Sequence, residues 1–280
     1  MRIRPMRADD IDAAERVTAR AFAPDGPPRS ALAKQRWTGR LAHILAVDRD
    51  GCWVAENDSG VIGVAASLRR DKLWVLSTFA IDPDHQGRGA GKALLDAAVG
   101  YSQGCLRGML CAMPHPGALR LYRNAGFNLH PTMCLTGVVT GDVVPDVRGV
   151  RLAGESDLDL VDSVDRRARD ATHRPDHAIM ASYGPLLICD IMNGSGYAYL
   201  DRATIGPLAA TSRAVAQRLM WAALAQIPPG EEVKVRYLTS EQEWALDVGL
   251  AAGLRIEQDG FLAFRHMRPP MPYIPSVPFG

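Results

Sequence analysis

The 280-residue sequence has almost no net charge and few cysteines. It carries 32 Lys and Arg against 31 Asp and Glu, a formal net charge of +1. This balance gives no field strong enough to recruit nucleic acid or an anionic membrane, so we expect neither as a partner. The cysteines lack the paired spacing of a zinc site and the density of a disulfide scaffold: they are Cys52, Cys105, Cys111, Cys134 and Cys189. Such scattered residues are typical of buried thiols in a reducing cytoplasm.

Long apolar runs are also missing. No run approaches the roughly 20 residues of a membrane span. Residues 1–10 alternate Arg with apolar residues and lack the apolar region and cleavage site of a signal peptide. A charged fraction of 22% and a hydrophobic fraction of 47% argue against long disorder or a heptad rod. Together these features predict a cytoplasmic globular protein.

The length of the chain exceeds the usual size of one domain, so we expect two. Glycine and proline punctuate residues 140–149, after which a strand-like run begins again at Val150. The boundaries that we predict are a first domain at 1–140, a linker at 141–149, a second domain at 150–268 and a Pro-rich tail at 269–280.

The second half repeats features of the first. Arg151–Asp157 resembles Arg4–Asp10, since each is a strand that leads to an acidic helix start. Two triplets recur at similar offsets, as divergent tandem copies would. These pairs are Ile81-Asp82-Pro83 with Ile205-Gly206-Pro207 and Ala125-Gly126-Phe127 with Ala252-Gly253-Leu254.

Periodicity in the first half predicts a mixed α/β fold. The expected elements are a strand at 2–5, helices at 9–23 and 30–41, strands at 52–56, 61–68 and 73–81, a helix at 90–102, a strand at 108–113, a helix at 117–125 and a strand at 127–139. The three central strands follow one another through short turns, which predicts an antiparallel meander. Gly126 is the expected C-cap of the last helix.

The most informative stretch is residues 77–92, which combine a strand, a Gly-rich loop and a helix start. Gly87, Gly89 and Gly91 allow a tight backbone whose successive N–H groups can point at one anion. The start of the helix adds its positive dipole end, so the loop predicts a pyrophosphate cradle with Arg88 and Lys92 as extra cations. No Gly-Lys-Ser/Thr ends the loop, and the antiparallel strands before it argue against a dinucleotide-binding βαβ unit.

These residues resemble the GNAT superfamily of acyltransferases. The acetyl-CoA loop of that family, Gln/Arg-x-x-Gly-x-Gly/Ala, is matched by Gln86, Gly89 and Gly91. A second family element, Asn-x-x-Ala-x-x-Leu-Tyr-x-x-x-Gly-Phe, is matched with His115 in place of Asn; its other residues are Ala118, Leu121, Tyr122, Gly126 and Phe127. The resemblance implies an α/β (α+β) fold of two tandem GNAT-like domains, each a mixed, largely antiparallel twisted sheet flanked by helices, the second degenerate.

The resemblance also implies acetyl-CoA as the cosubstrate. The pantetheine arm would lie along Phe79, Ala80 and Ile81. The pyrophosphate would be held by Gln86, Gly87, Arg88, Gly89, Ala90, Gly91 and Lys92. Tyr122 is the expected general acid, because a phenol with a reference pKa of about 10 stays protonated at pH 7. Spacing alone favours Tyr122 as a core aromatic, whereas the family pattern favours the catalytic role. An amine would attack the thioester directly, without a metal.

The sequence does not single out a general base. Ser77 and Thr78 stand where the family often has a carboxylate. The candidates that remain are Glu56, Asp58, His85 and His115, each also explicable as a surface or structural residue. Some tandem relatives bring a C-terminal carboxylate to the active site, which makes Gly280 a further candidate.

The second half lacks both chemical elements. Residues 208–213, interpreted as the loop after Ile205-Gly206-Pro207, have no phosphate-binding glycines, and Tyr122 corresponds to Gly249. We therefore expect a structural or substrate-shaping domain. The polar segment Arg169–His177 is expected to be a solvated loop rather than a lining of the acceptor cleft. The tail is expected to be extended along a groove rather than to form a strand.

Three functions are consistent with the sequence. The leading hypothesis is an N-acetyltransferase that acts on a primary amine of a small molecule, peptide or protein. The alternatives are a non-catalytic acyl-CoA-binding regulatory module and a structural or interaction protein whose glycines only form loops. The oligomeric state stays open, with a homodimer among the alternatives.

Overall fold

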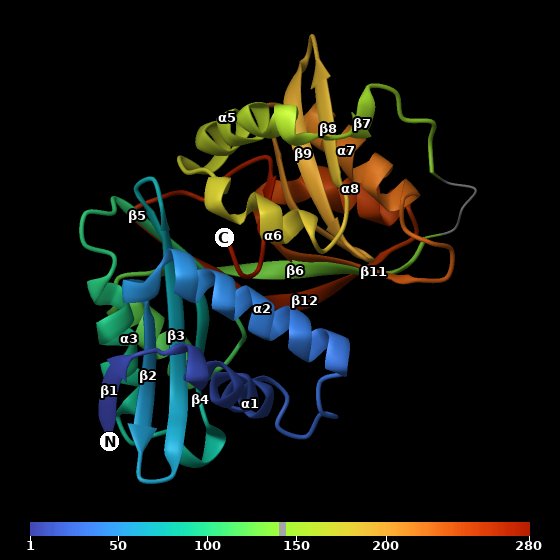
Figure 1. Cartoon of the computed structure of the whole chain (residues 1–280). Helices are drawn as coiled ribbons and strands as arrows, with labels where there is room; N and C mark the ends of the chain where they lie inside the picture. Colours follow the sequence, from blue (N-terminus) through green and yellow to red (C-terminus); the bar gives the residue numbers. More distant parts are fainter. Residues whose placement is uncertain (140–143) are drawn as a thin grey trace. The chain divides into compact units, whose positions relative to one another are not determined.

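The computed structural model describes residues 1–139 and 144–280, which form two compact units (Figure 1). The first comprises Met1–Leu110 and His115–Asn128, and the second Cys111–Pro114 and Leu129–Gly280. The sequence boundary at residue 140 differs from this division, because strand β6 (Asn128–Val138) pairs with a strand of the second unit. Residue 140, the last of the predicted first domain, and residues 141–143 of the predicted linker lie outside the described residues.

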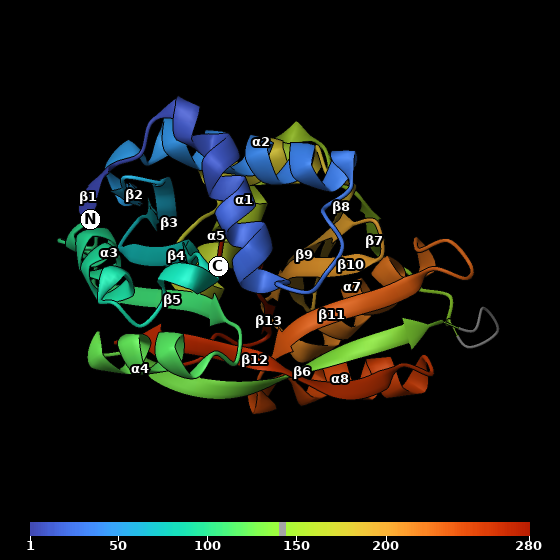
Figure 2. The same ribbon diagram turned by 90° about the horizontal axis from the view of Figure 1, so that it is seen from below.

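The first unit is built on a mixed sheet in the order β1-β2-β3-β4-β5. Its strands are β1 (Arg2–Pro5), β2 (Cys52–Asn57), β3 (Gly60–Arg70), β4 (Leu73–Ile81) and β5 (Arg107–Ala112). The predicted antiparallel meander is confirmed by β2, β3 and β4, while β5 runs parallel to β4. The helices are α1 (Ile11–Phe22), α2 (Ala31–Val47), α3 (Ala90–Gly100) and α4 (Pro116–Asn124). Figure 2 shows α1 and α2 on one side of this sheet and α3 on the other.

Local signals explain where the helices begin and end. The Ser30 hydroxyl accepts a hydrogen bond from the amide of Ala33, so it caps α2 as predicted. That helix continues past the predicted end, because Trp37, Leu41 and Ile44 keep the apolar spacing and are buried. Gly126 follows α4 in a left-handed conformation with φ 88°, which confirms the predicted C-cap.

The second unit contains a sheet in the order β12-β6-β11-β10-β9-β8-β7, with β13 paired to β10. Its other strands are β7 (Val150–Leu152), β8 (Leu186–Ile191), β9 (Gly194–Asp201), β10 (Thr204–Ala210), β11 (Glu232–Leu238), β12 (Arg255–Arg265) and β13 (Tyr273–Ile274). Its helices are α5 (Leu158–Arg169), α6 (His177–Ala181), α7 (Arg213–Ala225) and α8 (Glu243–Ala251). Helix α7 supplies much of the core through Leu219 and Met220, both fully buried.

The two units share an internal plan. After α4 the amide of Phe127 donates to the carbonyl of Tyr122 at 3.0 Å. After α8 the amide of Leu254 donates in the same way to the carbonyl of Gly249 at 2.9 Å. Gly253 has φ 82°, like the glycine after α4. These equivalent helix ends confirm that Gly249 occupies the position of Tyr122 in the second copy.

One predicted correspondence is wrong. Ile205-Gly206-Pro207 does not end a strand before a helix, as Ile81-Asp82-Pro83 does; it lies inside β10, where the pairing with β9 shifts register. Gly and Pro suggested a strand end, but both are tolerated at a β-bulge. Residues 208–210 are therefore strand, and only Thr211 and Ser212 separate β10 from α7.

Two further expectations for the second half are wrong. The segment 169–177 is not a solvated loop, since Arg169, His173, Asp176 and His177 are buried. The side chains of Arg169, His173 and His177 have hydrogen-bond partners in Phe279, Asp165 and Asp162, which offsets the cost of burial. The tail does form a short strand, β13, rather than only an extended segment. No helix in the described part of the chain combines the length and the apolarity needed to cross a membrane.

Candidate active site

Strands β4 and β5 pair over only the first half of β4. Their register runs from Leu73 with Arg107 to Leu76 with Leu110. On its other edge β4 stays paired with β3 as far as Ile81. Beyond Leu76 the second edge of β4 is therefore open in the described pairing, and strand N–H and C=O groups on such an edge are free to bind an extended ligand. Phe79, Ala80 and Ile81, the residues predicted for the pantetheine arm, lie on this part of the strand.

A β-bulge marks the point where the two strands part. Leu76 is opposite Ser67 of β3, and Thr78 is opposite Ala66, so Ser77 is the extra residue on β4. The pairing with β5 stops at the same point. A bulge leaves no recognisable composition in a single sequence, so this one could not be predicted.

The Gly-rich loop follows the end of β4, and its glycines border open space. Gly87 and Gly89 have φ values of 74° and 85°, and a Cβ added at either would meet no atom within 4 Å. The Gln86 side-chain amide donates to the carbonyl of Ile81 at 3.0 Å, which ties the loop back to the strand. The left-handed residues thus turn the backbone beside open space, as an anion-binding loop requires.

The base of the loop is held by an arginine from another element. Arg20, in the last turn of α1, donates to carboxylate oxygens of Asp82 and Asp84, both at 2.7 Å. Hydrogen bonding to Arg20 lowers the pKa of Asp84 below its usual value. The Asp82 side chain also accepts from the amide of Asp84 at 3.1 Å. This anchor could not be predicted from the sequence, because nothing near the loop points to a residue of α1.

Helix α3 begins directly after the loop, at Ala90. The first amide that bonds back toward the helix start is that of Ala93, to the carbonyl of Gly89 at 3.2 Å. The amides of Ala90, Gly91 and Lys92 precede it in the first turn, where N–H groups have no intrahelical acceptor and favour an anion. A side chain at Gly91 would crowd Leu121 of α4, whose Cδ1 lies 3.2 Å from an added Cβ.

The two predicted phosphate-binding cations, Arg88 and Lys92, have different surroundings. The Lys92 ammonium lies 2.6 Å from Asp96 along the same helix, so its charge is paired there. Arg88 is exposed on the loop. An anion bound at the loop would thus rely mainly on main-chain N–H groups and on the α3 dipole.

Tyr122 lies beside the open edge of β4. It is buried on α4, at 5% exposure, and its ring meets that of Phe79 edge-on with centroids 6.0 Å apart. The α4 helix is capped by His115, whose Nδ1 accepts from the amide of Ala118 at 3.3 Å. His115 therefore performs the capping task for which Asn is well suited.

The candidate bases have separate surroundings. Glu56 accepts from the Arg4 guanidinium at 2.6 Å, and Asp58 is exposed at the β2–β3 turn. His85 Nδ1 lies 3.5 Å from Asp82. His115 acts as a helix cap. Glu56, His85 and His115 therefore each have a contact that explains them as structural residues. The structure brings together β4, the loop and Tyr122.

A comparison with known protein families bears on this geometry. Residues 48–129 match the model of the acetyltransferase (GNAT) domain. Residues 48–129 are a GNAT acetyltransferase domain. The matched span contains the open edge of β4, the Gly-rich loop, the start of α3 and Tyr122. The predicted cofactor-binding residues and Tyr122 therefore all lie within the matched span.

Known proteins extend the likeness to the whole chain. An uncharacterized N-acetyltransferase of Methanocaldococcus jannaschii is 24% identical over 136 residues, which are 45% of this chain and 59% of the relative. The chain therefore spans about three-fifths of that relative. A crystal structure from Pyrococcus horikoshii, assigned as an acetyltransferase, superimposes with a TM-score of 0.79 at 18% identity and covers 100% of this chain and 95% of the other. A tandem GNAT protein from the clavulanic acid pathway gives a TM-score of 0.60 at 14% identity, with coverages of 94% and 97%. These likenesses show a tandem GNAT fold.

Proposed function

We propose that the first unit is the working site of an N-acetyltransferase that moves an acetyl group from acetyl-CoA to a primary amine. One arrangement supports this function most directly. The unpaired edge of β4 leads into the loop of Gly87 and Gly89 and then into the start of α3, with Tyr122 beside the edge. An extended arm that ends in a pyrophosphate fits this order of main-chain groups.

Acetyl-CoA would bind mainly through the backbone. The amides and carbonyls of Phe79, Ala80 and Ile81 would pair with the pantetheine arm as a neighbouring strand does. The N–H groups from Gly87 to Lys92 would surround the pyrophosphate. The thioester would then lie toward the bulge at Ser77, near the ring of Tyr122.

The reaction would be a direct attack in a ternary complex. The amine nitrogen forms a bond to the thioester carbon, and the oxyanion that develops is stabilised by an N–H of the β4 edge. When the carbon–sulfur bond breaks, Tyr122 gives its hydroxyl proton to the leaving thiolate. The amine nitrogen loses a proton to water, and the tyrosinate regains one from water. The products are the amide and the CoA thiol.

A second function is favoured by one observation. Ser77 and Thr78, at the point where β4 and β5 part, carry no carboxylate that could accept the proton of the amine. This composition suits a regulatory module that binds acyl-CoA without turnover. For either function we propose a cytoplasmic location, since the cysteines of the protein are free thiols and two of them, Cys52 and Cys189, are buried.

The proposal is tested by calorimetric titration of acetyl-CoA into matched glycine variants. Gly89→Asp adds a negative charge at the start of α3, where a Cβ has open space at φ 85°. Gly104→Asp is the control, because it has φ 82° and equally open surroundings away from the loop. We expect binding by the wild type and by the control and none by Gly89→Asp. Equal binding by both variants would place the ligand elsewhere.

A further inference from the structure

In the second unit, the edge of β10 that corresponds to the open edge of β4 is filled by the tail of the chain. Strand β10 pairs with the parallel strand β11 only at Thr204 with Lys234. Farther along, Leu208 and Ala209 pair with β13. Because β9 occupies the opposite edge of β10 and β13 also contacts β11, β13 lies where β10 and β11 part (Figure 2). A peptide segment thus takes the place of a cofactor arm.

The tail is held through its main chain. Gln242 donates from its side-chain amide to the carbonyl of Pro270 at 2.8 Å and accepts from the amide of Tyr273 at 3.1 Å. Trp244 donates to the same Gln242 oxygen at 2.8 Å and fixes its orientation. These hydrogen bonds are made to main-chain groups of the tail rather than to its side chains, as in sites that bind an extended strand.

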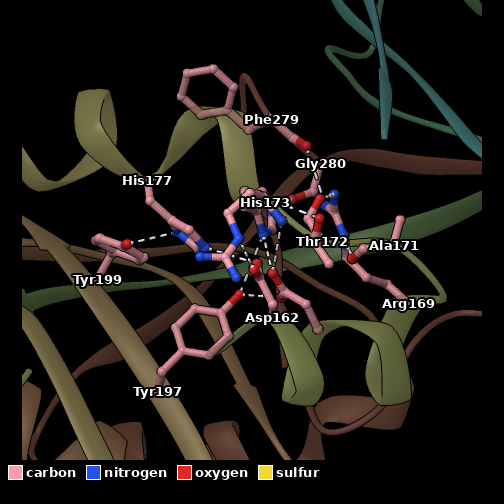
Figure 3. Close-up of polar contacts among 12 residues, drawn as sticks. Asp162, Arg169, Ala171, Thr172, His173, His177, Tyr197, Tyr199, Phe279 and Gly280 are labelled. Carbon is pink, nitrogen blue, oxygen red and sulfur yellow. Dashed lines mark hydrogen bonds and ion pairs between the residues drawn. The ribbon is translucent and has the colours of Figure 1, made fainter. Parts of the chain in front are cut away.

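A buried cation binds the end of the tail (Figure 3). Arg169 is fully buried, and its guanidinium donates to the carbonyl of Phe279 and to the hydroxyl of Tyr273, both at 3.2 Å. It also donates to the carbonyls of Ala171 and Thr172, at 3.0 and 3.2 Å. A buried guanidinium is costly unless its donors are satisfied, so the tail supplies acceptors that this residue needs.

A second group reaches the last residue of the segment. His173 Nε2 lies 3.3 Å from the Gly280 oxygen, and the Tyr273 hydroxyl donates to the same oxygen at 2.7 Å. The other ring nitrogen of His173 lies 2.7 Å from Asp165, which also accepts from the hydroxyl of Tyr197. Figure 3 shows His173 and Arg169 beside Gly280. The buried carboxylate thus orients the imidazole toward Gly280.

The tail itself has the features of a bound peptide. Tyr273, Ile274 and Phe279 are buried, at 2%, 0% and 1% exposure, whereas Val277 is exposed. The segment that joins the tail to β12 is more accessible, with His266 and Arg268 exposed. Three buried apolar anchors, main-chain bonds along a strand edge and an accessible connection are the features of a tethered peptide ligand.

We propose that the second unit is a peptide-binding site built on the GNAT plan, in which the groove between β10 and β11 accepts an extended segment and residues 272–280 are its resident occupant. The groove has lost the means to hold acyl-CoA, because only Thr211 and Ser212 separate β10 from α7. It has gained the Arg169, His173 and Gln242 contacts to backbone oxygens. This inference does not depend on acetyl transfer in the first unit.

The test uses the full-length chain with a protease site inserted between His266 and Pro269. After cleavage we expect the tail to stay bound and then to exchange with a fluorescent synthetic peptide of residues 270–280. Hydrogen exchange at the amides of Leu208–Ala210 should rise when the tail is diluted away and fall when the peptide is added. A peptide with Phe279→Ala should bind at least tenfold more weakly, without any change to the protein.

A variant pair in the protein completes the test. Arg169→Gln should speed the release of the cleaved tail at least tenfold, and Arg167→Gln, an exposed position on the same helix, should leave it unchanged. Three results would overturn the proposal. They are unfolding of the second unit on loss of the tail, a tail that cannot be exchanged under native conditions, and release without a change in protection at Leu208–Ala210.

Discussion

The ring of Tyr122 meets the ring of Phe79 edge-on, with their centroids 6.0 Å apart. This contact links α4 to the unpaired edge of β4, two elements separated along the chain by α3 and β5. It sets the phenol beside the strand that would carry the thioester. The same ring also fills space in the core, so the packing and the chemical roles of Tyr122 have to be separated by experiment.

Tyr122→Phe separates them, because it keeps the ring against Phe79 and removes only the hydroxyl. We expect the kcat of acetyl transfer to fall by about 100-fold or more, the usual contribution of a general acid, while the Kd for acetyl-CoA stays within about twofold. Tyr101→Phe is the control: it loses a 3.1 Å hydrogen bond to Asp48 away from the loop, and its kcat should be unchanged. Full activity in Tyr122→Phe would leave that residue only its packing role.

Gln86→Ala tests the anchor of the loop. Removing the amide frees the carbonyl of Ile81 and loosens the turn into Gly87. A hydrogen bond contributes about 0.5–1.5 kcal/mol, so we expect the Kd for acetyl-CoA to rise by up to about tenfold in calorimetry. Gln103→Ala, an exposed residue after α3, is the matched control and should bind as the wild type does.

The two units should differ in ligand binding. The first has an eight-residue loop at 82–89 and an open strand edge, and the second has two loop residues and an edge filled by β13. We expect one acetyl-CoA per chain in a calorimetric titration. A value of two would show that the second unit retains a cofactor site.

Stability should depend on pH through His177. Burial lowers the pKa of this imidazole, which lies 3.0 Å from Asp162 and 2.9 Å from the Tyr199 hydroxyl. In the unfolded chain its pKa returns to about 6.5, so the unfolded state binds more protons just below that pH. The free energy of unfolding should therefore decrease as the pH falls below about 6.5.

Urea unfolding between pH 8 and pH 5 measures this dependence. His177→Gln should reduce the slope below pH 6.5, whereas His266→Gln, at an exposed position, should leave it as in the wild type. An unchanged slope in His177→Gln would assign the acid sensitivity to other groups.

Much of the first unit could be predicted because its signals are local. Strand β4 spans Leu73–Ile81 as expected, and Ser30 and Gly126 cap their helices through neighbours three to five residues away. Gly87 and Gly89 turn the loop in left-handed conformations, as expected of glycines at such a tight turn, whereas Gly91 lies in α3. Each of these features depends on residues close together in the sequence.

The features that escaped prediction depend on distant partners. Arg169 is buried because it bonds Phe279, 110 residues away, and a polar run beside Pro175 gives no sign of that partner. The strand at Tyr273 exists because β10 offers an edge. The bulge at Ser77 arises from register with β3 and β5. No periodicity in the sequence encodes such pairings.

The most direct test of the account is release of the CoA thiol from acetyl-CoA in the presence of a panel of primary amines. We predict release that depends on the amine, is lost in Gly89→Asp and is kept in Gly104→Asp. Acetyl-CoA binding without release for any amine would contradict catalysis and favour a binding module. Absence of both binding and release would contradict the acetyltransferase function altogether.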